Sequence, residues 1–128
     1  MPKTVVRSEH APAPVAAYSQ AVRAGDFLFL SGQIALDPKS GQLVPGGIEA
    51  ETRRVLDNLM SVLEAGGATR QDVVKVTAYL ADMQEYPAFN AIYTTYFPDE
   101  PPARATVAVA GLPRGVRVEI DAIAMVAR

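Results

Sequence analysis

Residues 46–80, GGIEAETRRVLDNLMSVLEAGGATRQDVVKVTAYL, contain the change of period that decides the fold. In the first half of this stretch, residues that can pack recur every three or four positions, which predicts an α-helix with one buried face. The predicted buried face comprises Ile48, Thr52, Val55, Leu56, Leu59, Val62 and Leu63. The opposite face is predicted to carry Arg53, Arg54, Asp57, Asn58 and Glu64. Gly66-Gly67 predicts the end of the helix, because glycine favours a helix C-terminus.

After the glycine pair, the period of the packing residues falls to two. Strict alternation predicts a β-strand with one packed face and one polar face. The predicted packed residues of this strand are Val74, Val76, Ala78 and Leu80, which alternate with Lys75, Thr77 and Tyr79.

The rest of the chain supplies further strands and a second helix. Short apolar runs predict strands at 4–7, 18–23 and 27–30, the last two joined by a turn at Gly25-Asp26. A second helix contains Pro87 in its first turn, where proline is tolerated. Its predicted apolar stripe is Tyr86, Phe89, Tyr93, Tyr96 and Phe97. Two final strands, at about 103–110 and 116–126, flank a turn at 111–115.

This order of elements predicts one two-layer α+β domain over residues 1–128, with a mixed sheet covered on one face by two helices. A chain of 128 residues is long enough to bury its own core. The hydrophobic fraction is 49%, and only 20% of residues are charged. We therefore expect part of the apolar surface to meet another subunit.

The charge and the termini exclude several classes of partner. The net charge is −2, and the 12 Lys and Arg residues are scattered, so a nucleic-acid partner is not expected. The N-terminus lacks the apolar core of a secretion signal, and no apolar run approaches the roughly 18 residues of a membrane span. We expect a soluble, cytoplasmic protein with no membrane partner.

The chain also lacks most of the residues that usually bind metals or act as activated nucleophiles. The chain contains no cysteine, which removes disulfides, thiolate metal sites and cysteine nucleophiles. Its one histidine, His10, lies in a Pro-Ala-rich segment without a second histidine, so we predict neither a metal site nor a His-based triad. No cofactor-binding motif occurs, because Gly46-Gly47 and Gly66-Gly67 lack the pattern of a phosphate loop.

Charged residues inside the two final strands are the main candidates for a site. Alternation places Glu119 and Asp121 on the strand face that does not meet the helices. Arg104 and Thr106 share one face of the preceding strand, and antiparallel pairing of the two strands is expected to bring Arg104 beside Glu119 or Asp121. From residue chemistry alone, a structural ion pair or a solvated sheet face is the commoner explanation. The same pair can also hold a small carboxylic acid while a second group moves a proton.

Three other segments carry weaker signals. Gly32, in Ser31-Gly32-Gln33, permits close approach of the backbone to a ligand, or begins a turn or bulge. Tyr18 is more often a packed aromatic than a binding residue. Asn90 lies in the second helix, where a polar amide either faces solvent or meets a partner chain.

Together, four motifs resemble the RidA family, also called the YjgF family, over essentially the whole chain. The first joins Ala11-Pro12 with Tyr18-Ser19-Gln20-Ala21, and the second joins Ser31-Gly32-Gln33-Ile34 with Asp37-Pro38 and Gly41. The third is Pro102-Ala103-Arg104-Ala105-Thr106-Val107, and the fourth is Val118-Glu119-Ile120-Asp121-Ala122-Ile123-Ala124. The last two motifs together are the most specific.

The resemblance implies a chorismate-mutase-like fold assembled as a homotrimer, with a cleft between each pair of subunits. It implies an imine and enamine deaminase that hydrolyses 2-aminoacrylate or 2-iminobutanoate to a 2-keto acid and ammonia without a cofactor. By motif, Arg104 grips the substrate carboxylate with the Gly32 amide, and Glu119 positions or activates the water. Tyr18, Ser31, Asn90 and Thr106 line the cleft. Thr106 stands where some family members have cysteine, and Ala16-Ala17 replace a frequent Gly-Pro.

Two other functions remain open at this level. Diverged members of the superfamily imply a non-catalytic, small-ligand-binding or chaperone-like trimeric stress protein, and intact Arg104 and Glu119 favour the enzyme over it. A ribonuclease is the third possibility, and the weak basic content and single histidine argue against it.

Overall fold

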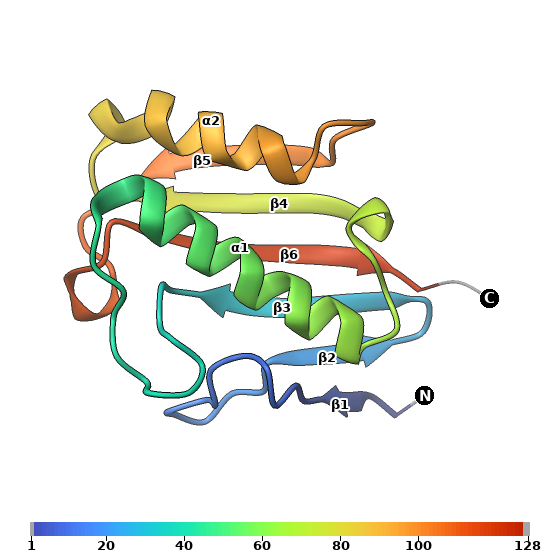
Figure 1. The fold of residues 1–128 in the computed structure, drawn as a ribbon. Coiled ribbons are helices and arrows are strands. Elements are labelled where there is room, and N and C mark those ends of the chain that lie inside the picture. The colour runs from blue at the N-terminus through green and yellow to red at the C-terminus, as the bar shows by residue number, and fades with distance from the viewer. Residues whose placement is uncertain (1, 127–128) are drawn as a thin grey trace.

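Six strands form one mixed sheet, and both α-helices lie against the same face of it in the computed structural model, which describes residues 2–126 (Figure 1). In spatial order the strands are β1 (Thr4–Val6), β2 (Ala21–Ala24), β3 (Phe27–Gln33), β6 (Val118–Met125), β4 (Val73–Leu80) and β5 (Ala103–Ala108). The helices are α1 (Gly47–Ala65) and α2 (Tyr86–Tyr96), and short 3-10 helices span Arg70–Asp72, Met83–Glu85 and Pro113–Gly115. The predicted two-layer α+β fold is confirmed.

Helix α1 covers the centre of the sheet, and every residue of its predicted packing face is buried. Asn58, which was predicted on the polar face, is instead fully buried. Its Nδ2 donates to the carbonyl oxygens of Ile34 and Leu36, and its Oδ1 accepts from Arg54 Nε. A polar side chain tolerates burial when its hydrogen bonds are satisfied, and here those bonds attach the segment after β3 to α1.

Strand β4 departs from the predicted alternation at its first residues. A shift in the β4–β6 register between Val73 and Lys75 places Val73 in the core and leaves Val74 exposed. A bulge adds one residue to a strand and therefore changes which face its neighbours occupy. From Val76 onward the predicted pattern holds.

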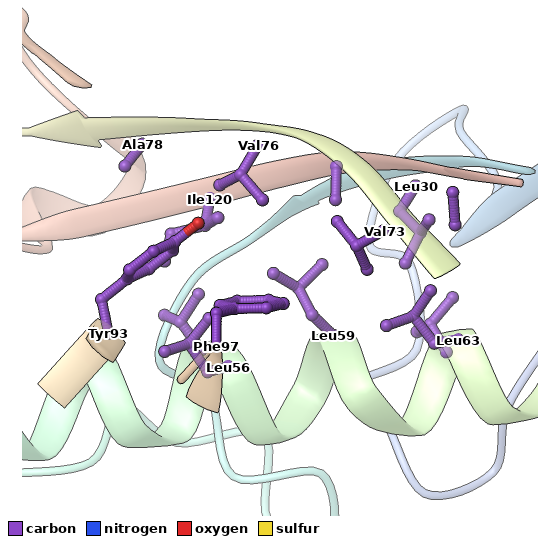
Figure 2. Packing of buried hydrophobic residues seen from close by; sticks show 14 of the residues in the cluster. Leu30, Leu56, Leu59, Leu63, Val73, Val76, Ala78, Tyr93, Phe97 and Ile120 are labelled. Carbon is purple, nitrogen blue, oxygen red and sulfur yellow. The ribbon is translucent and has the colours of Figure 1, made fainter. Parts of the chain in front are cut away.

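Helix α2 contributes aromatic rings to the core. Phe89 and Tyr93 have ring centroids 5.7 Å apart, and those of Tyr93 and Phe97 are 4.9 Å apart. Figure 2 shows the Tyr93 and Phe97 rings between the helices and the sheet, with the Tyr93 hydroxyl directed toward the strands. These tilted stacks bury large apolar areas and fix the helix over the β4–β5 edge.

The predicted antiparallel pairing of the two final strands is wrong. β5 instead pairs in parallel with β4, and β4 lies between β5 and β6. A parallel neighbour requires a crossover connection, which α2 provides between β4 and β5. In this register Arg104 lies beside Val76 and Thr106 beside Ala78, on the face that the helices cover.

Glu119 lies on the opposite face of the sheet, beside Tyr79. Val118 and Ile120, the residues on either side of Glu119 in β6, point into the core as predicted. No helix within residues 2–126 is both long and apolar enough to cross a bilayer.

Replacing Asn58 by alanine should lower the free energy of unfolding by roughly 2–3 kcal/mol, because the Leu36 carbonyl loses its donor, the Ile34 carbonyl keeps only its bond from the Leu36 amide, and Arg54 loses an acceptor. Urea denaturation at one fixed protein concentration measures this loss. Ser61→Ala on the same helix is the control: its hydroxyl donates to the Asp57 carbonyl at the surface, and its removal should change stability by less than about 0.5 kcal/mol. Equal effects of the two substitutions would contradict the assigned role of Asn58.

Candidate functional site

The Glu119 carboxylate packs directly against the backbone of Gly32 on the neighbouring strand. A Cβ atom built at position 32 would overlap Glu119 Oε2 and come within 3.0 Å of the carboxyl carbon. The β3–β6 register also shifts here, because Leu30 pairs with Ala122 and Gln33 with Ile120. Ser31 and Gly32 therefore form a bulge, a feature that often redirects a strand beside a functional site. Glycine at position 32 makes room for the carboxylate.

Glu119 opens into a pocket of about 390 Å³, which we call the carboxylate pocket. Its walls are mostly apolar, with one carboxylate, one guanidinium and one phenol. The lining residues are Pro12, Ala13, Val15, Tyr18, Ser31, Gly32, Gln33, Ile34, Leu36, Pro113, Arg114 and Glu119. The pocket thus brings together Tyr18, Ser31, Gly32 and Glu119 from the predicted site.

Buried polar side chains fasten the walls of the carboxylate pocket. Gln20 Nε2 donates to the carbonyl oxygen of Pro12 at 2.8 Å, and Gln20 Oε1 accepts from the Ser8 amide. Ser31 Oγ donates to the Ser19 carbonyl at 2.6 Å. Sequence reasoning missed Gln20 and Asn58 as wall supports. A buried side-chain amide with several backbone partners leaves no periodic pattern in the sequence. The only signal for Gln20 was its place in the family motif Tyr18-Ser19-Gln20-Ala21.

Arg104 lies in a separate cluster under α2. Its Nη1 donates to Asn90 Oδ1 at 2.9 Å, and its Nη2 donates to the Tyr86 hydroxyl at 2.6 Å. The guanidinium carbon is 4.6 Å from the ring centroid of Tyr93 and 5.6 Å from that of Phe89. Aromatic faces attract the cation, and the two hydrogen bonds orient its fork. Tyr86 was predicted only as a packing residue.

A second pocket, of about 440 Å³, exposes Arg104 and is called the arginine pocket here. It is lined by Asn90, Tyr93, Thr94, Phe97, Pro98, Pro101, Pro102 and Arg104. No carboxylate within residues 2–126 forms a salt bridge with Arg104. Its remaining guanidinium donors are therefore available to an anion.

Thr106 does not line either pocket, although it was predicted as a binding residue. Its Oγ1 is buried without a hydrogen-bond partner, as is the hydroxyl of Tyr93. Both atoms lie on the helix-covered side of the sheet, where Arg104 also lies. Buried hydroxyl groups without hydrogen-bond partners are uncommon, so this region holds polar groups whose hydrogen-bonding capacity is unused.

Burial raises the pKa of Glu119 above its ordinary value, and the negative charge of Asp121 adds to the rise. The side chain of Asp121 accepts a hydrogen bond from the Tyr79 hydroxyl at 3.0 Å. A carboxyl group with a raised pKa, placed in a pocket, is a candidate proton carrier.

The two halves of the predicted site do not meet within one chain. Arg104, Asn90 and Thr106 lie on the helix-covered side, at the β5 edge. Glu119 and Gly32 lie on the other side, beyond β4 in the sheet order. His10 is exposed and belongs to neither pocket. Within residues 2–126, no three His, Asp or Glu side chains cluster in a way that could hold a metal ion.

Comparison with known proteins identifies close relatives of the whole chain. The model of the family described as Endoribonuclease L-PSP matches residues 8–126. A RutC family protein of Pyrococcus horikoshii is 49% identical over 95% of this chain and 97% of its own length. The 2-iminobutanoate/2-iminopropanoate deaminase of Mus musculus is 50% identical, covering 96% of this chain and 91% of its own.

A solved structure also matches nearly the whole chain. The crystal structure of RidA from an Antarctic bacterium, Psychrobacter sp., matches with a TM-score of 0.92 at 36% identity. That match covers 95% of this chain and 98% of the Psychrobacter chain. At this identity the likeness extends beyond the fold to the family.

Glu119→Gln should stabilise the protein at neutral pH. The folded state raises the pKa of Glu119, so it binds more protons than the unfolded state between the two pKa values, and its stability falls as the pH rises through that interval. Glutamine cannot ionise, so the variant should show a higher urea midpoint at pH 7.

The advantage of the variant should disappear as the pH falls toward 4.5, the ordinary glutamate value. Glu64→Gln, at an exposed position of α1, provides the charge-matched control and should show no such pH-dependent gain. A Glu119→Gln variant that is less stable than wild type at pH 7 would contradict the burial of an unfavourable charge.

Proposed function

Since the chain belongs to the Endoribonuclease L-PSP family, which includes RidA and YjgF proteins, we propose that it hydrolyses small 2-imino and 2-enamino acids to 2-keto acids and ammonia. Mouse, rat and goat relatives 45–50% identical to the chain carry the name 2-iminobutanoate/2-iminopropanoate deaminase. The observation that supports the proposal most strongly is a pair of groups, the Arg104 guanidinium held in a fixed orientation and the half-buried Glu119 carboxyl group with its raised pKa.

The proposed active site requires two copies of the chain. Because Arg104 and Glu119 lie on opposite faces of one sheet, a small substrate can touch both only if each comes from a different copy. The helix-free face also exposes large apolar side chains that another copy can cover. These are Val5, Phe27, Phe29, Val107 and Met125. We propose the homotrimer that the family resemblance implies, with the arginine pocket of one copy facing the carboxylate pocket of the next.

Arg104 binds the substrate carboxylate in this scheme. A planar guanidinium holds a carboxylate through two parallel hydrogen bonds, and Asn90 and Tyr86 already fix its orientation. Little side-chain entropy is lost on binding, because the fork is ordered beforehand. The Gly32 amide, at the bulge beside Glu119, supplies a further donor to the substrate. Tyr18 and Ser31 close the carboxylate pocket around it.

Glu119 moves the proton. A water molecule adds its oxygen to the carbon of the protonated imine and gives one proton to Glu119, which yields a neutral amino alcohol. Glu119 then returns that proton to the amino nitrogen, the C–N bond breaks, and the keto C=O bond forms. The hydroxyl proton leaves with ammonia as ammonium, so substrate and water give keto acid and ammonium. A raised pKa makes Glu119 a stronger base and lets it hold the proton between the two steps.

Thr106 has a supporting role in this proposal. Its buried, unpartnered Oγ1 lies two residues from Arg104 on the same strand face and lines neither pocket of the single chain, so a hydrogen bond to substrate requires the site that forms between copies. Imine hydrolysis proceeds in water without help, so orientation of the substrate and one water supplies most of the required catalysis.

The family description also names an endoribonuclease, and this provides a second candidate activity. The net charge of −2 does not favour binding through many phosphates. RNA cleavage that persists through purification and survives loss of Arg104 would favour the endoribonuclease. A trimer that binds 2-keto acids without accelerating hydrolysis would favour the non-catalytic binding protein.

Arg104→Ala should reduce imine hydrolysis about 30-fold or more. The substrate carboxylate loses its guanidinium partner, and truncating one member of such a charged pair costs roughly 2 kcal/mol or more. The assay generates 2-aminoacrylate with a dehydratase and follows the release of pyruvate and ammonia. Arg104→Lys keeps the charge but loses the planar fork, so it should recover only part of the activity. Arg70→Ala, at an exposed site outside both pockets, is the control. Wild-type rates in Arg104→Ala would overturn the proposal.

Mixed trimers test whether the site is shared between copies. Arg104→Ala and Glu119→Gln subunits are each expected to be inactive as homotrimers, and light scattering should give each three times the 13.6 kDa chain mass. Refolding the two together should restore activity, since every mixed trimer contains one site with an intact Arg104 from one copy and an intact Glu119 from the next. Absence of recovery in confirmed mixed trimers would show that the two residues do not share a site across copies.

A further inference from the structure

Asp121 and Tyr79 form a hydrogen-bonded pair directly beside Glu119. Glu119 and Asp121 are two residues apart on one face of β6, so their Cα atoms are separated by about 7 Å. On β4, Tyr79 lies opposite Glu119, but its hydroxyl reaches diagonally to Asp121 Oδ2 at 3.0 Å. The tyrosine therefore fixes the second carboxylate and leaves Glu119 without that donor.

The two carboxylates also border a common hollow of about 290 Å³. It is lined by Tyr79, Val109, Gly111, Leu112, Pro113, Glu119 and Asp121. Glu119 and Pro113 line the carboxylate pocket as well, so Glu119 stands between the two spaces. Glu119 thus lines the space proposed for the substrate and also shares the second hollow with Asp121.

Two arginines on segments next to Glu119 already have partners elsewhere. Arg117, immediately before β6, pairs with Glu85 at 2.8 Å and with Glu51 at 3.9 Å. Arg114, which lines the carboxylate pocket, donates to the Gly41 carbonyl. The remaining titratable groups on these elements are Tyr18, Lys75 and, in the proposed assembly, Arg104 of a second copy. Asp121 is the like charge that faces Glu119 along its own strand.

We propose that Asp121, fixed by the Tyr79 hydroxyl, is a positioning residue whose negative charge adds to the effect of burial in suiting Glu119 to carry a proton in the site. The role in turnover rests on the proposed deaminase function, whereas the effect on Glu119 does not. A nearby like charge disfavours ionisation of Glu119 and strengthens it as a base. The pKa of Tyr79 is raised by burial and by its bond to Asp121, so the phenol keeps its proton and remains a donor.

Carbon-detected NMR of the side-chain carboxyl groups tests the proposal without an activity assay. The Glu119 signal is assigned by its loss in Glu119→Gln, and its titration is followed in wild type, Asp121→Asn and Tyr79→Phe. The titration midpoint of Glu119 should move to lower pH in Asp121→Asn. Tyr79→Phe should also move the Glu119 midpoint to lower pH, but by less. The Asp121 charge remains in this variant, but the Tyr79 hydroxyl no longer fixes its position. Tyr79→Phe also provides the test if Asp121→Asn does not fold.

Asp57→Asn is the matched control. Tyr96 donates to Asp57 Oδ1 at 2.7 Å between the two helices, so this substitution removes the same kind of bond and the same charge far from Glu119. It should leave the Glu119 midpoint in place. A midpoint unmoved in both Asp121→Asn and Tyr79→Phe, or moved equally by Asp57→Asn, would overturn the proposal.

The pH profile of kcat then separates this role from a purely structural one. Asp121→Asn should move the acid limb to lower pH and lower the plateau, because Glu119 becomes the weaker base. A structural defect would lower kcat at every pH without moving the limb and would contradict the role in turnover. If wild type hydrolyses no imine, the proposed function fails, while the NMR titration still decides whether Asp121 acts on Glu119.

Discussion

The parallel pairing of β5 with β4 is the constraint on which the arrangement of the candidate site depends. Parallel neighbours need a crossover, and the crossover helix α2 must cover the strand that it delivers. Arg104 consequently lies beneath α2, among the rings and hydroxyl groups of that helix. An antiparallel hairpin would have placed the arginine beside Glu119 in the same chain. The crossover instead separates them by a strand and a sheet face, which makes a second copy part of the proposed chemistry.

Each half of the proposed site is already ordered within the single chain. On the arginine side, Asn90 and Tyr86 fix the guanidinium through short hydrogen bonds. On the carboxylate side, the bulge at Gly32 makes room for Glu119, and Gln20 and Asn58 fasten the surrounding loops. Groups that are ordered in advance lose less entropy when a ligand binds. Burial of Glu119 has an energetic cost in the folded chain, as expected where function and stability compete.

The sequence predicted the local elements well, because periodicity reports directly on which side of an element is buried. The buried stripe of α1 and the alternation of β6 follow from it. The pairing of β5 could not be read the same way, because a strand's own pattern does not name its neighbour. The prediction that Val74 is packed was wrong for a related reason. A bulge changes which sheet face each residue occupies, and the composition of the strand does not reveal it. The polar supports Gln20 and Asn58 are defined by distant backbone carbonyls, which have no sequence signature.

In the proposed active site, one chain supplies the arginine and another supplies the glutamate. A crystal structure of the protein with a 2-keto acid, the proposed product, tests this most directly. We expect the ligand carboxylate on Arg104 of one copy and its carbonyl carbon beside Glu119 and Gly32 of the adjacent copy. A keto acid bound away from the junction of the two pockets, or contacting only one chain in an assembly that keeps Arg104 and Glu119 apart, would contradict it.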